Sequence, residues 1–183
     1  PVQTPICDFG KKALPFELRS TDNKIISLDN IKGENGTLIM FICNHCPYVK
    51  AVTKEIVEDC NELKKIGINS VAICSNDAVN YPDDSFDNMI KFSEENKFSF
   101  PYLQDETQEI AKAYDAVCTP DFFGYDKDLG LQYRGRLREL KNFVPAKDGV
   151  SDLLKAMKQI AETGKGPQDQ IPSAGCGIKW KYD

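Results

Sequence analysis

Residues 41–50 read Phe41-Ile42-Cys43-Asn44-His45-Cys46-Pro47-Tyr48-Val49-Lys50. An apolar run from Thr37 to Ile42 ends at this Cys-x-x-Cys, and a helix-like pattern begins directly after it. A helix N-terminus carries unpaired N–H groups and about half a positive charge, which together stabilise a thiolate. Because the thiolate is the nucleophilic form of cysteine, this placement predicts a reactive dithiol formed by Cys43 and Cys46.

The one histidine of the chain, His45, lies between the two cysteines. When protonated, it would add a second source of thiolate stabilisation. Two other interpretations are half of a zinc site and a pair of unreactive buried cysteines. A structural zinc site needs four ligands, and the sequence has no second Cys/His pair with ligand spacing. We therefore expect redox chemistry, with no metal and no cofactor.

The composition describes an ordinary soluble globule of 183 residues, a length that suits one domain. Lys and Arg number 23 against 28 Asp and Glu, and no basic patch stands out, so we expect neither nucleic acid nor a membrane as partner. Seven cysteines, an odd number with several in predicted core, favour a reducing cytoplasm over a secreted disulfide scaffold. No signal-like segment is present, and the chain begins at Pro1, which leaves open that an upstream segment was removed.

Strands and helices alternate along the chain. Hydrophobic periodicity predicts a hairpin over 16–28, buried strands over 37–43 and 70–75, helices from 47 to 63, 86 to 96 and 108 to 114, a hairpin turning at 126–130 and a closing helix over 150–161. This order indicates a three-layer α/β/α domain with a central mixed sheet. In open α/β sheets functional sites lie beyond the carboxyl ends of strands, where Cys43 stands.

The motifs in combination resemble the thioredoxin superfamily and, within it, the redoxin branch, the alkyl hydroperoxide reductase/thiol-specific antioxidant or peroxiredoxin-like family. The resemblance implies one thioredoxin-like (redoxin) domain over residues 1–183, with an N-terminal β-hairpin and residues 164–183 as an extended C-terminal tail. Its marks are residues 43–50, Ser75-Asn76-Asp77, Tyr81-Pro82-Asp83-Asp84-Ser85, Cys118-Thr119-Pro120-Asp121, Tyr133-Arg134-Gly135-Arg136 and Gly175-Cys176-Gly177-Ile178-Lys179-Trp180-Lys181.

By this resemblance, Thr119-Pro120 is the cis-proline turn that faces the active site. The backbone before that proline would offer an edge on which an extended substrate docks in β fashion. Cys118 stands two residues before the proline, which makes it either a packing residue or a redox partner of the dithiol. Cys176 in the tail is either a resolving thiol or an exposed cysteine without a role.

The sequence departs from peroxiredoxins at positions that matter for their chemistry. Peroxiredoxins resemble Pro-x-x-x-Thr-x-x-Cys, and aligning the last cysteine with Cys46 places Ile39 at the proline and Cys43 at the threonine. The hydroxyl that orients peroxide is therefore replaced by a thiol. Arg134 or Arg136 could supply the cation of a peroxide pocket, although hairpin arginines are commonly surface charges.

These observations predict an enzyme, a thiol–disulfide oxidoreductase that acts on protein or small-molecule disulfides and thiols. Cys43, as the more exposed thiol, would attack the substrate disulfide, Cys46 would resolve the mixed disulfide, and His45 would stabilise the Cys43 thiolate. The alternative is a peroxidase in which peroxide oxidises Cys46, or else Cys43, to sulfenic acid and the other thiol resolves it. A third possibility is a redox-responsive binding module whose partner docks at Pro120 and the 76–84 loop.

Overall fold

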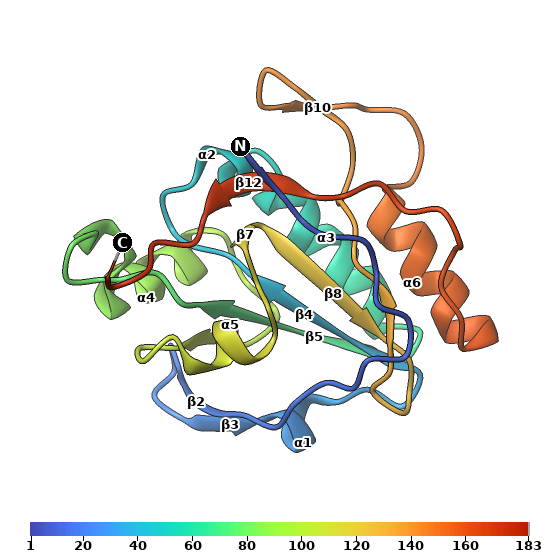
Figure 1. Cartoon of the computed structure of the whole chain (residues 1–183), viewed down its shortest axis with the longest axis horizontal. Helices are drawn as coiled ribbons and strands as arrows, with labels where there is room; N and C mark the ends of the chain where they lie inside the picture. The colour runs from blue at the N-terminus through green and yellow to red at the C-terminus, as the bar shows by residue number, and fades with distance from the viewer. Residues whose placement is uncertain (183) are drawn as a thin grey trace.

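A seven-stranded mixed sheet forms the centre of the computed structural model, which describes residues 1–182 (Figure 1). The strand order is β3-β2-β6-β5-β4-β8-β9. The central strands β4, β5 and β6 are parallel, and the flanking pairings are antiparallel. The strands are β2 (Glu17–Ser20), β3 (Ile25–Ser27), β4 (Gly36–Phe41), β5 (Ile68–Cys74), β6 (Tyr102–Gln104), β8 (Asp121–Tyr125) and β9 (Leu131–Tyr133).

Helices cover both faces of this sheet, and β4 shows why. Its side chains alternate between faces: Leu38 and Met40 join the apolar cluster with α3, α4 and α6, whereas Ile39 and Phe41 join the cluster with α1 and α5. This confirms the three-layer architecture. Among residues 1–182, no helix has the length and apolar character needed to cross a membrane. The helices are α1 (Leu28–Ile31), α2 (Pro47–Lys50), α3 (Thr53–Lys64), the 3₁₀ turn η1 (Pro82–Asp84), α4 (Phe86–Glu95), α5 (Glu109–Ala113) and α6 (Asp152–Thr163).

The helix expected to run unbroken from residue 47 to 63 is interrupted between α2 and α3. Val52 leaves helical geometry at φ −115° and ψ 0°. The Thr53 hydroxyl donates a hydrogen bond of 2.7 Å to the carbonyl of Val49. Side-chain bonds of this kind compete with the helical ladder and bend helices. The short α2 is therefore a separate turn that follows the two cysteines.

The segment predicted as an extended tail, residues 164–183, is extended over most of its described part, residues 164–182, but contributes a strand, and residue 183 lies outside the described residues. β12 (Ala174–Gly177) lies between β1 (Val2–Gln3) and β7 (Cys118–Thr119) in a second sheet of order β1-β12-β7. In Figure 1 this strand crosses above the main sheet beside α2. Gly175 permits the close approach, because an added Cβ would lie 2.0 Å from the carbonyl oxygen of Thr119. A small hairpin, β10 (Leu140–Lys141) and β11 (Val144–Pro145), precedes α6.

Candidate active site

The two cysteines of the motif lie between the end of β4 and the start of α2, as the sequence predicts. Cys46 is the N-cap residue of α2, directly before Pro47. Both cysteines are free thiols, and each is only 1% exposed. The expectation that Cys43 is the more exposed thiol is therefore wrong, because the fold encloses the two sulfurs equally.

Thr119, at the end of β7, contacts both sulfurs. The Cys46 thiol donates to the Thr119 carbonyl at 3.3 Å, and the Thr119 hydroxyl lies 3.6 Å from Cys43 Sγ. The peptide bond between Thr119 and Pro120 is cis, as the family resemblance implied. This turn brings the backbone before the proline onto the dithiol, the arrangement expected of a docking edge.

The docking edge is already occupied by the chain itself. β12 pairs antiparallel with β7, and Cys176 stands opposite Thr119. A substrate strand can use this edge only after β12 moves away, because one edge of a strand pairs with one partner. Substrate docking at Thr119 and Pro120 therefore stays a prediction, and the structure adds displacement of β12 as its condition.

The surroundings of the two thiols separate their acidities. The hydrogen bond between them raises the pKa of Cys43, and burial and the charge of Asp84 raise it further. The same bond lowers the pKa of Cys46, and hydrogen bonds from Thr119 and Cys176 act in the same direction. Cys46 also stands at the helix N-terminus, which favours a thiolate. Burial of Cys46 opposes these causes, but together they favour the thiolate on Cys46, the reverse of the expectation that Cys43 is the more acidic thiol.

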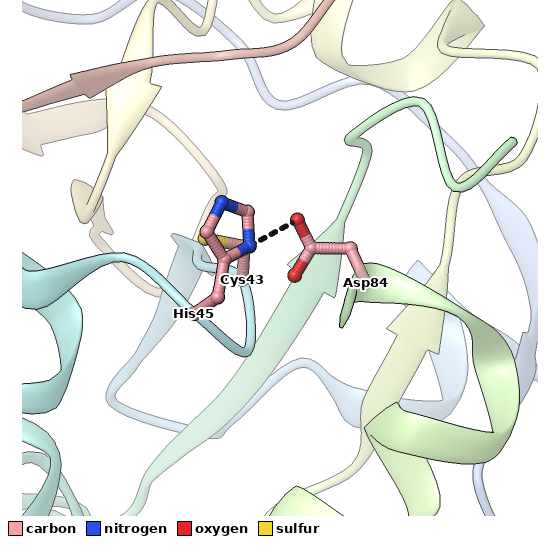
Figure 2. Close-up of side chains that lie close together, drawn as sticks. All are labelled: Cys43, His45 and Asp84. Carbon is pink, nitrogen blue, oxygen red and sulfur yellow. Dashed lines mark ion pairs between the residues drawn. The ribbon is translucent and has the colours of Figure 1, made fainter. Parts of the chain in front are cut away.

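Asp84 lies beside His45 and Cys43 (Figure 2). Its Oδ2 is 2.8 Å from His45 Nδ1, and its side chain is fully buried, whereas that of His45 is 30% exposed. Tyr81 stacks on the imidazole with an interplanar angle of 4°. His45 is thus held by a carboxylate and an aromatic ring, and its Nδ1 faces Asp84. A thiol, Cys43, an imidazole that can act as its base, His45, and a carboxylate that orients the imidazole, Asp84, therefore lie next to one another.

Asp84 also fixes the loop between the cysteines, a role that the sequence analysis missed. Its carboxylate accepts hydrogen bonds from the backbone N–H of Asn44 at 2.8 Å and from the amide of Asn76 at 2.9 Å. The Tyr102 hydroxyl donates to the Asn44 side chain at 2.8 Å. The only signal in the sequence was that Asp84 and Asn76 fall within two of the motifs that mark the family. Their function as supports becomes visible only in the fold.

Cys43, His45 and Asp84 could together hold a metal ion, since one ligand atom from each lies within 4.8 Å of the others. Their sulfur, nitrogen and oxygen atoms are of the types that zinc binds. Three ligands are one short of a structural zinc site, and the absence of a metal stays a prediction. A hollow of about 490 Å³ opens next to this group. Its lining includes Asn44, His45, Lys50, Asp83, Lys91 and Glu95.

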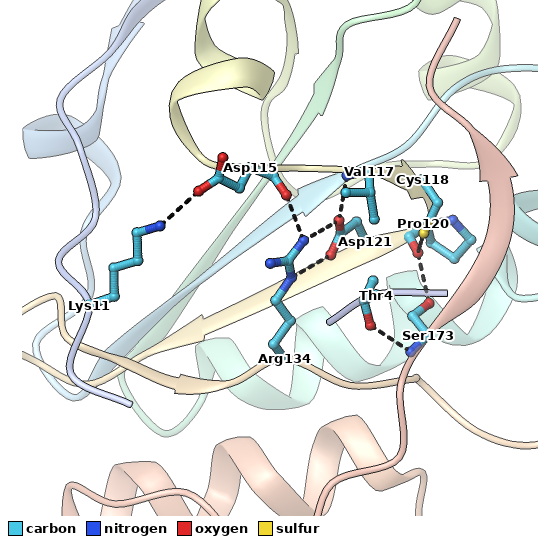
Figure 3. Close-up of polar contacts among 9 residues, drawn as sticks. All are labelled: Thr4, Lys11, Asp115, Val117, Cys118, Pro120, Asp121, Arg134 and Ser173. Atoms are coloured by element: carbon cyan, nitrogen blue, oxygen red, sulfur yellow. Dashed lines mark hydrogen bonds and ion pairs between the residues drawn. The ribbon is translucent and has the colours of Figure 1, made fainter. Parts of the chain in front are cut away.

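Arg134 lies in the interior, not on the surface where the sequence analysis expected hairpin arginines (Figure 3). Its guanidinium donates two hydrogen bonds, of 2.9 and 3.1 Å, to the buried carboxylate of Asp121 and one of 2.9 Å to the Asp115 carbonyl. Arg136 is likewise paired, with Asp152 at 2.7 Å. Arg134 thus fixes the segment that carries the cis-proline, and both arginines are engaged with carboxylates of the fold.

Two further cysteines lie near the dithiol on different elements. Cys118 is fully buried, and its thiol donates to the Pro120 carbonyl at 3.6 Å. Burial raises its pKa, which suits a packing residue. Cys176 is only partly buried and packs against the apolar cluster that contains Cys43 and Cys46. The structure therefore brings Cys176 to the dithiol.

A model of the AhpC/TSA family matches residues 9–137, which include both cysteines of the motif, the cis-proline and Arg134. The chain belongs to the AhpC/TSA family. This redoxin is a mixed α/β protein of thioredoxin-like architecture. Among curated proteins, none matches its sequence.

Solved structures extend the likeness over the whole redoxin chain. An uncharacterized conserved protein from Geobacillus kaustophilus is 45% identical with a TM-score of 0.92, and the match covers 100% of this chain and 97% of that one. A hypothetical protein from Sinorhizobium meliloti is 31% identical with the same TM-score, and 100% of both chains is covered. The thioredoxin domain of a thiol-disulfide oxidoreductase from Bacteroides vulgatus is 18% identical, with a TM-score of 0.59 over 73% of this chain and 89% of that one. This last match shows a shared fold.

Proposed function

We propose that this protein is a thiol–disulfide oxidoreductase whose electron carrier is the Cys43–Cys46 pair. The observation that carries the proposal is the pair itself: two free thiols lie at the start of a helix, and both contact Thr119, the residue before a cis-proline. Membership of a redoxin family supports thiol chemistry in general. The name of the Bacteroides vulgatus relative supports disulfide exchange in particular.

The acidities of the two thiols assign the steps. The Cys46 thiolate attacks one sulfur of a substrate disulfide, and the other substrate sulfur leaves as a thiolate that takes a proton from water. Cys43 then gives up its proton and attacks Cys46 Sγ, so that the second substrate thiol is released as the Cys43–Cys46 disulfide forms. The substrate gains two electrons, and the protein loses two. The reverse sequence would oxidise a dithiol.

His45 is placed to accept the proton that Cys43 loses. The environment of Cys43 favours its thiol form, so its attack on the mixed disulfide needs a base. A ring nitrogen of His45, the Cys43 sulfur and an Asp84 carboxylate oxygen all lie within 4.8 Å of one another, and Asp84 Oδ2 lies 2.8 Å from His45 Nδ1. His45 would therefore take part in the chemistry directly, in addition to any electrostatic effect on the thiols.

The substrates proposed are protein or low-molecular-weight disulfides and thiols, and the place of action proposed is the cytoplasm. The hollow beside His45 is large enough for a small disulfide. Peroxide is the less favoured substrate for two reasons. Cys43 takes the place of the threonine that would orient it, and Arg134 is committed to Asp121.

The test compares the second-order rates at which the reduced protein is oxidised by oxidised glutathione and by hydrogen peroxide at one pH. Disulfide is expected to react faster, and Cys46→Ser should abolish the reaction. Peroxide reacting faster by several decades, with sulfenic acid trapped on Cys46 in Cys43→Ser, would establish a peroxidase instead. Stoichiometric capture of a partner without turnover would favour the binding module.

A further inference from the structure

Cys46 has a second thiol neighbour in addition to Cys43. Cys176 stands opposite Thr119 in the antiparallel pairing of β12 with β7, and the Thr119 carbonyl lies 3.3 Å from the Cys46 sulfur. Cys176 also packs against the apolar cluster that contains Cys46, and its thiol and backbone N–H contribute to the lowered pKa of Cys46. The Cys46 sulfur therefore has one thiol neighbour from its own loop, Cys43, and one from the C-terminal strand, Cys176.

We propose that Cys176 is a third redox-active cysteine, which forms a disulfide with Cys46 and carries the oxidised state from the buried pair to the protein surface. The proposal rests on the function proposed above, since it needs Cys46 to become oxidised. It adds a role for the C-terminal strand, which the thiol pair alone does not require.

The transfer is a disulfide exchange within the protein. Once Cys43 and Cys46 are joined, the Cys176 thiolate attacks Cys46 Sγ. The Cys46–Cys176 bond forms as the Cys43–Cys46 bond breaks, and Cys43 takes up the proton that Cys176 has lost. No electron enters or leaves the protein in this step, so no further oxidant is needed.

The three cysteines differ in exposure, and this difference explains what the transfer achieves. Cys43 and Cys46 are each 1% exposed, so an external reactant reaches them only when β12 moves away from β7. Cys176 is only half-buried. A reducing thiol can therefore attack Cys176 Sγ and expel Cys46, whose lowered pKa makes it the better leaving group.

In the reduced protein, the charge of the Cys46 thiolate favours the protonated, less nucleophilic form of Cys176. Burial raises the pKa of Cys176 to about 11, and the hydrogen bond to Cys46 and the Cys46 charge contribute to that rise. When Cys46 enters a disulfide, it carries no charge and both of its contributions disappear. The charge of Lys179, which lowers this pKa, remains. Oxidation of Cys46 therefore makes Cys176 a better nucleophile at neutral pH.

Two glycines that flank Cys176 allow its position to be tested without changing a thiol. A Cβ on Gly175 would lie 2.0 Å from the Thr119 carbonyl oxygen, so Gly175→Ala must push β12 away from β7. A Cβ on Gly177 would meet only the Val2 side chain at 3.4 Å, an ordinary contact. Gly177→Ala is therefore a matched control on the same strand.

The decisive experiment oxidises the full-length Cys43→Ser protein with oxidised glutathione and maps its disulfides by peptide mass spectrometry. The expected product is a Cys46–Cys176 disulfide with release of glutathione, and its yield should fall strongly when Gly175→Ala is added but not when Gly177→Ala is added. A stable Cys46–glutathione adduct, or a bond from Cys46 to Cys118, would overturn the proposal.

A second measurement keeps this proposal separate from the proposed function. Oxidised Cys176→Ser should hold a Cys43–Cys46 disulfide that external glutathione reduces roughly tenfold or more slowly than the oxidised wild type. Equal reduction rates would reject the role of Cys176 and leave the oxidoreductase standing. If the wild type forms no disulfide at Cys46 at all, the oxidoreductase itself fails.

Discussion

Three groups converge on the Cys46 sulfur: the Cys43 thiol, Thr119 and Cys176. Each comes from a different element, and the start of α2 adds its own partial positive charge. Cys43 has the opposite surroundings, because the nearby Asp84 carboxylate disfavours a second negative charge. Two cysteines three residues apart are thus given unlike roles by their neighbours.

Replacing Cys43 should therefore change the acidity of Cys46. Cys43→Ala removes the largest cause of the lowered pKa of Cys46, so that pKa should rise, whereas Cys43→Ser retains a hydroxyl donor and should change it less. A tenfold change in the acid dissociation constant corresponds to about 1.4 kcal/mol of thiolate stabilisation. The measurement is the ultraviolet absorbance of the thiolate as a function of pH, with Cys46→Ser as the blank. An identical titration in wild type and Cys43→Ala would contradict the assigned cause.

His45 and Asp84 should act together in the step in which Cys43 attacks the mixed disulfide and releases the substrate thiol. His45→Ala is expected to slow that step by roughly 10²-fold, the size typical of a lost general base. Asp84→Asn should slow it less, and the double variant should be no slower than His45→Ala, because Asp84 acts through His45. Single-turnover release of glutathione reports the rate, and in His45→Ala it should rise with pH as hydroxide replaces the base. Additive losses with an unchanged pH profile would point to a merely structural role.

The sequence pointed to the cysteines and His45 and assigned the thiolate to Cys43, whereas the surroundings of the two sulfurs favour Cys46. The periodicity predicted a helix from residue 47, and α2 begins there, so the residue directly at the helix start is Cys46 and not Cys43. Asp84 follows a loop and reaches the site only through the turn η1, and sequence spacing does not define that path. Acidity depends on such long-range neighbours, so it could not be deduced from the motif.

Between β7 and β9, a buried ion pair fixes the segment that carries the cis-proline. Arg134 joins Asp121 and the Asp115 carbonyl, and Asp121 in turn accepts the Val117 N–H at 3.0 Å. Lys11 forms an ion pair with the same Asp115 at 2.8 Å, but this pair is exposed. The two pairs allow the effect of burial to be measured on one segment.

Breaking the buried pair should cost far more stability than breaking the exposed one. Arg134→Met leaves the Asp121 charge buried without a partner, a change that typically costs ~3–5 kcal/mol of unfolding free energy. Lys11→Met should cost less than about 1 kcal/mol. Urea unfolding measures both, and the double variant Arg134→Met/Asp121→Leu should recover much of the loss. Equal losses in the two single variants would show that the Arg134 pair is not a special support.

Periodicity predicted the elements of the main sheet well, because each buried strand and long amphipathic helix leaves its own pattern. Two features left no such pattern. The break at Val52 depends on a single hydroxyl bond from Thr53. β12 is only four residues long, with Gly175 and Gly177 where apolar residues would mark a strand, and only its partner β7 shows why position 175 needs glycine.

Across the whole molecule, the C-terminal segment connects parts of the fold that are distant in sequence. The Ser173 hydroxyl donates to the Pro120 carbonyl at 2.7 Å, and Ser173 also exchanges hydrogen bonds with Thr4 (Figure 3). Further along, the Lys179 carbonyl accepts from the Asp77 backbone N–H and the Gln108 side chain, each at 2.8 Å. The same segment therefore closes the active site and supports the 76–84 loop.

Ending the chain after Pro172 should accordingly weaken the fold and expose the thiols of Cys43 and Cys46. The loss of several buried hydrogen bonds, each contributing about 1 kcal/mol, is expected to lower the melting temperature by roughly 10 °C. Alkylation of Cys46 should become faster at temperatures where the fold persists, because β12 no longer covers it. Calorimetry and mass-resolved alkylation measure the two effects.

Two variants make this last comparison interpretable. Ending the chain after Lys181 keeps every contact of Ser173 and Lys179, so its melting temperature and alkylation rate should match those of the wild type. Ile178→Ala keeps the strand but removes a buried side chain that anchors it, at a typical cost of ~2–5 kcal/mol, and should shift both readouts in the direction of the truncation. If the truncated protein melts like the wild type and Cys46 stays equally protected, the thiols are enclosed by α2 and β7 alone. Transfer of the disulfide to Cys176 would then no longer explain how the disulfide becomes accessible to an external thiol.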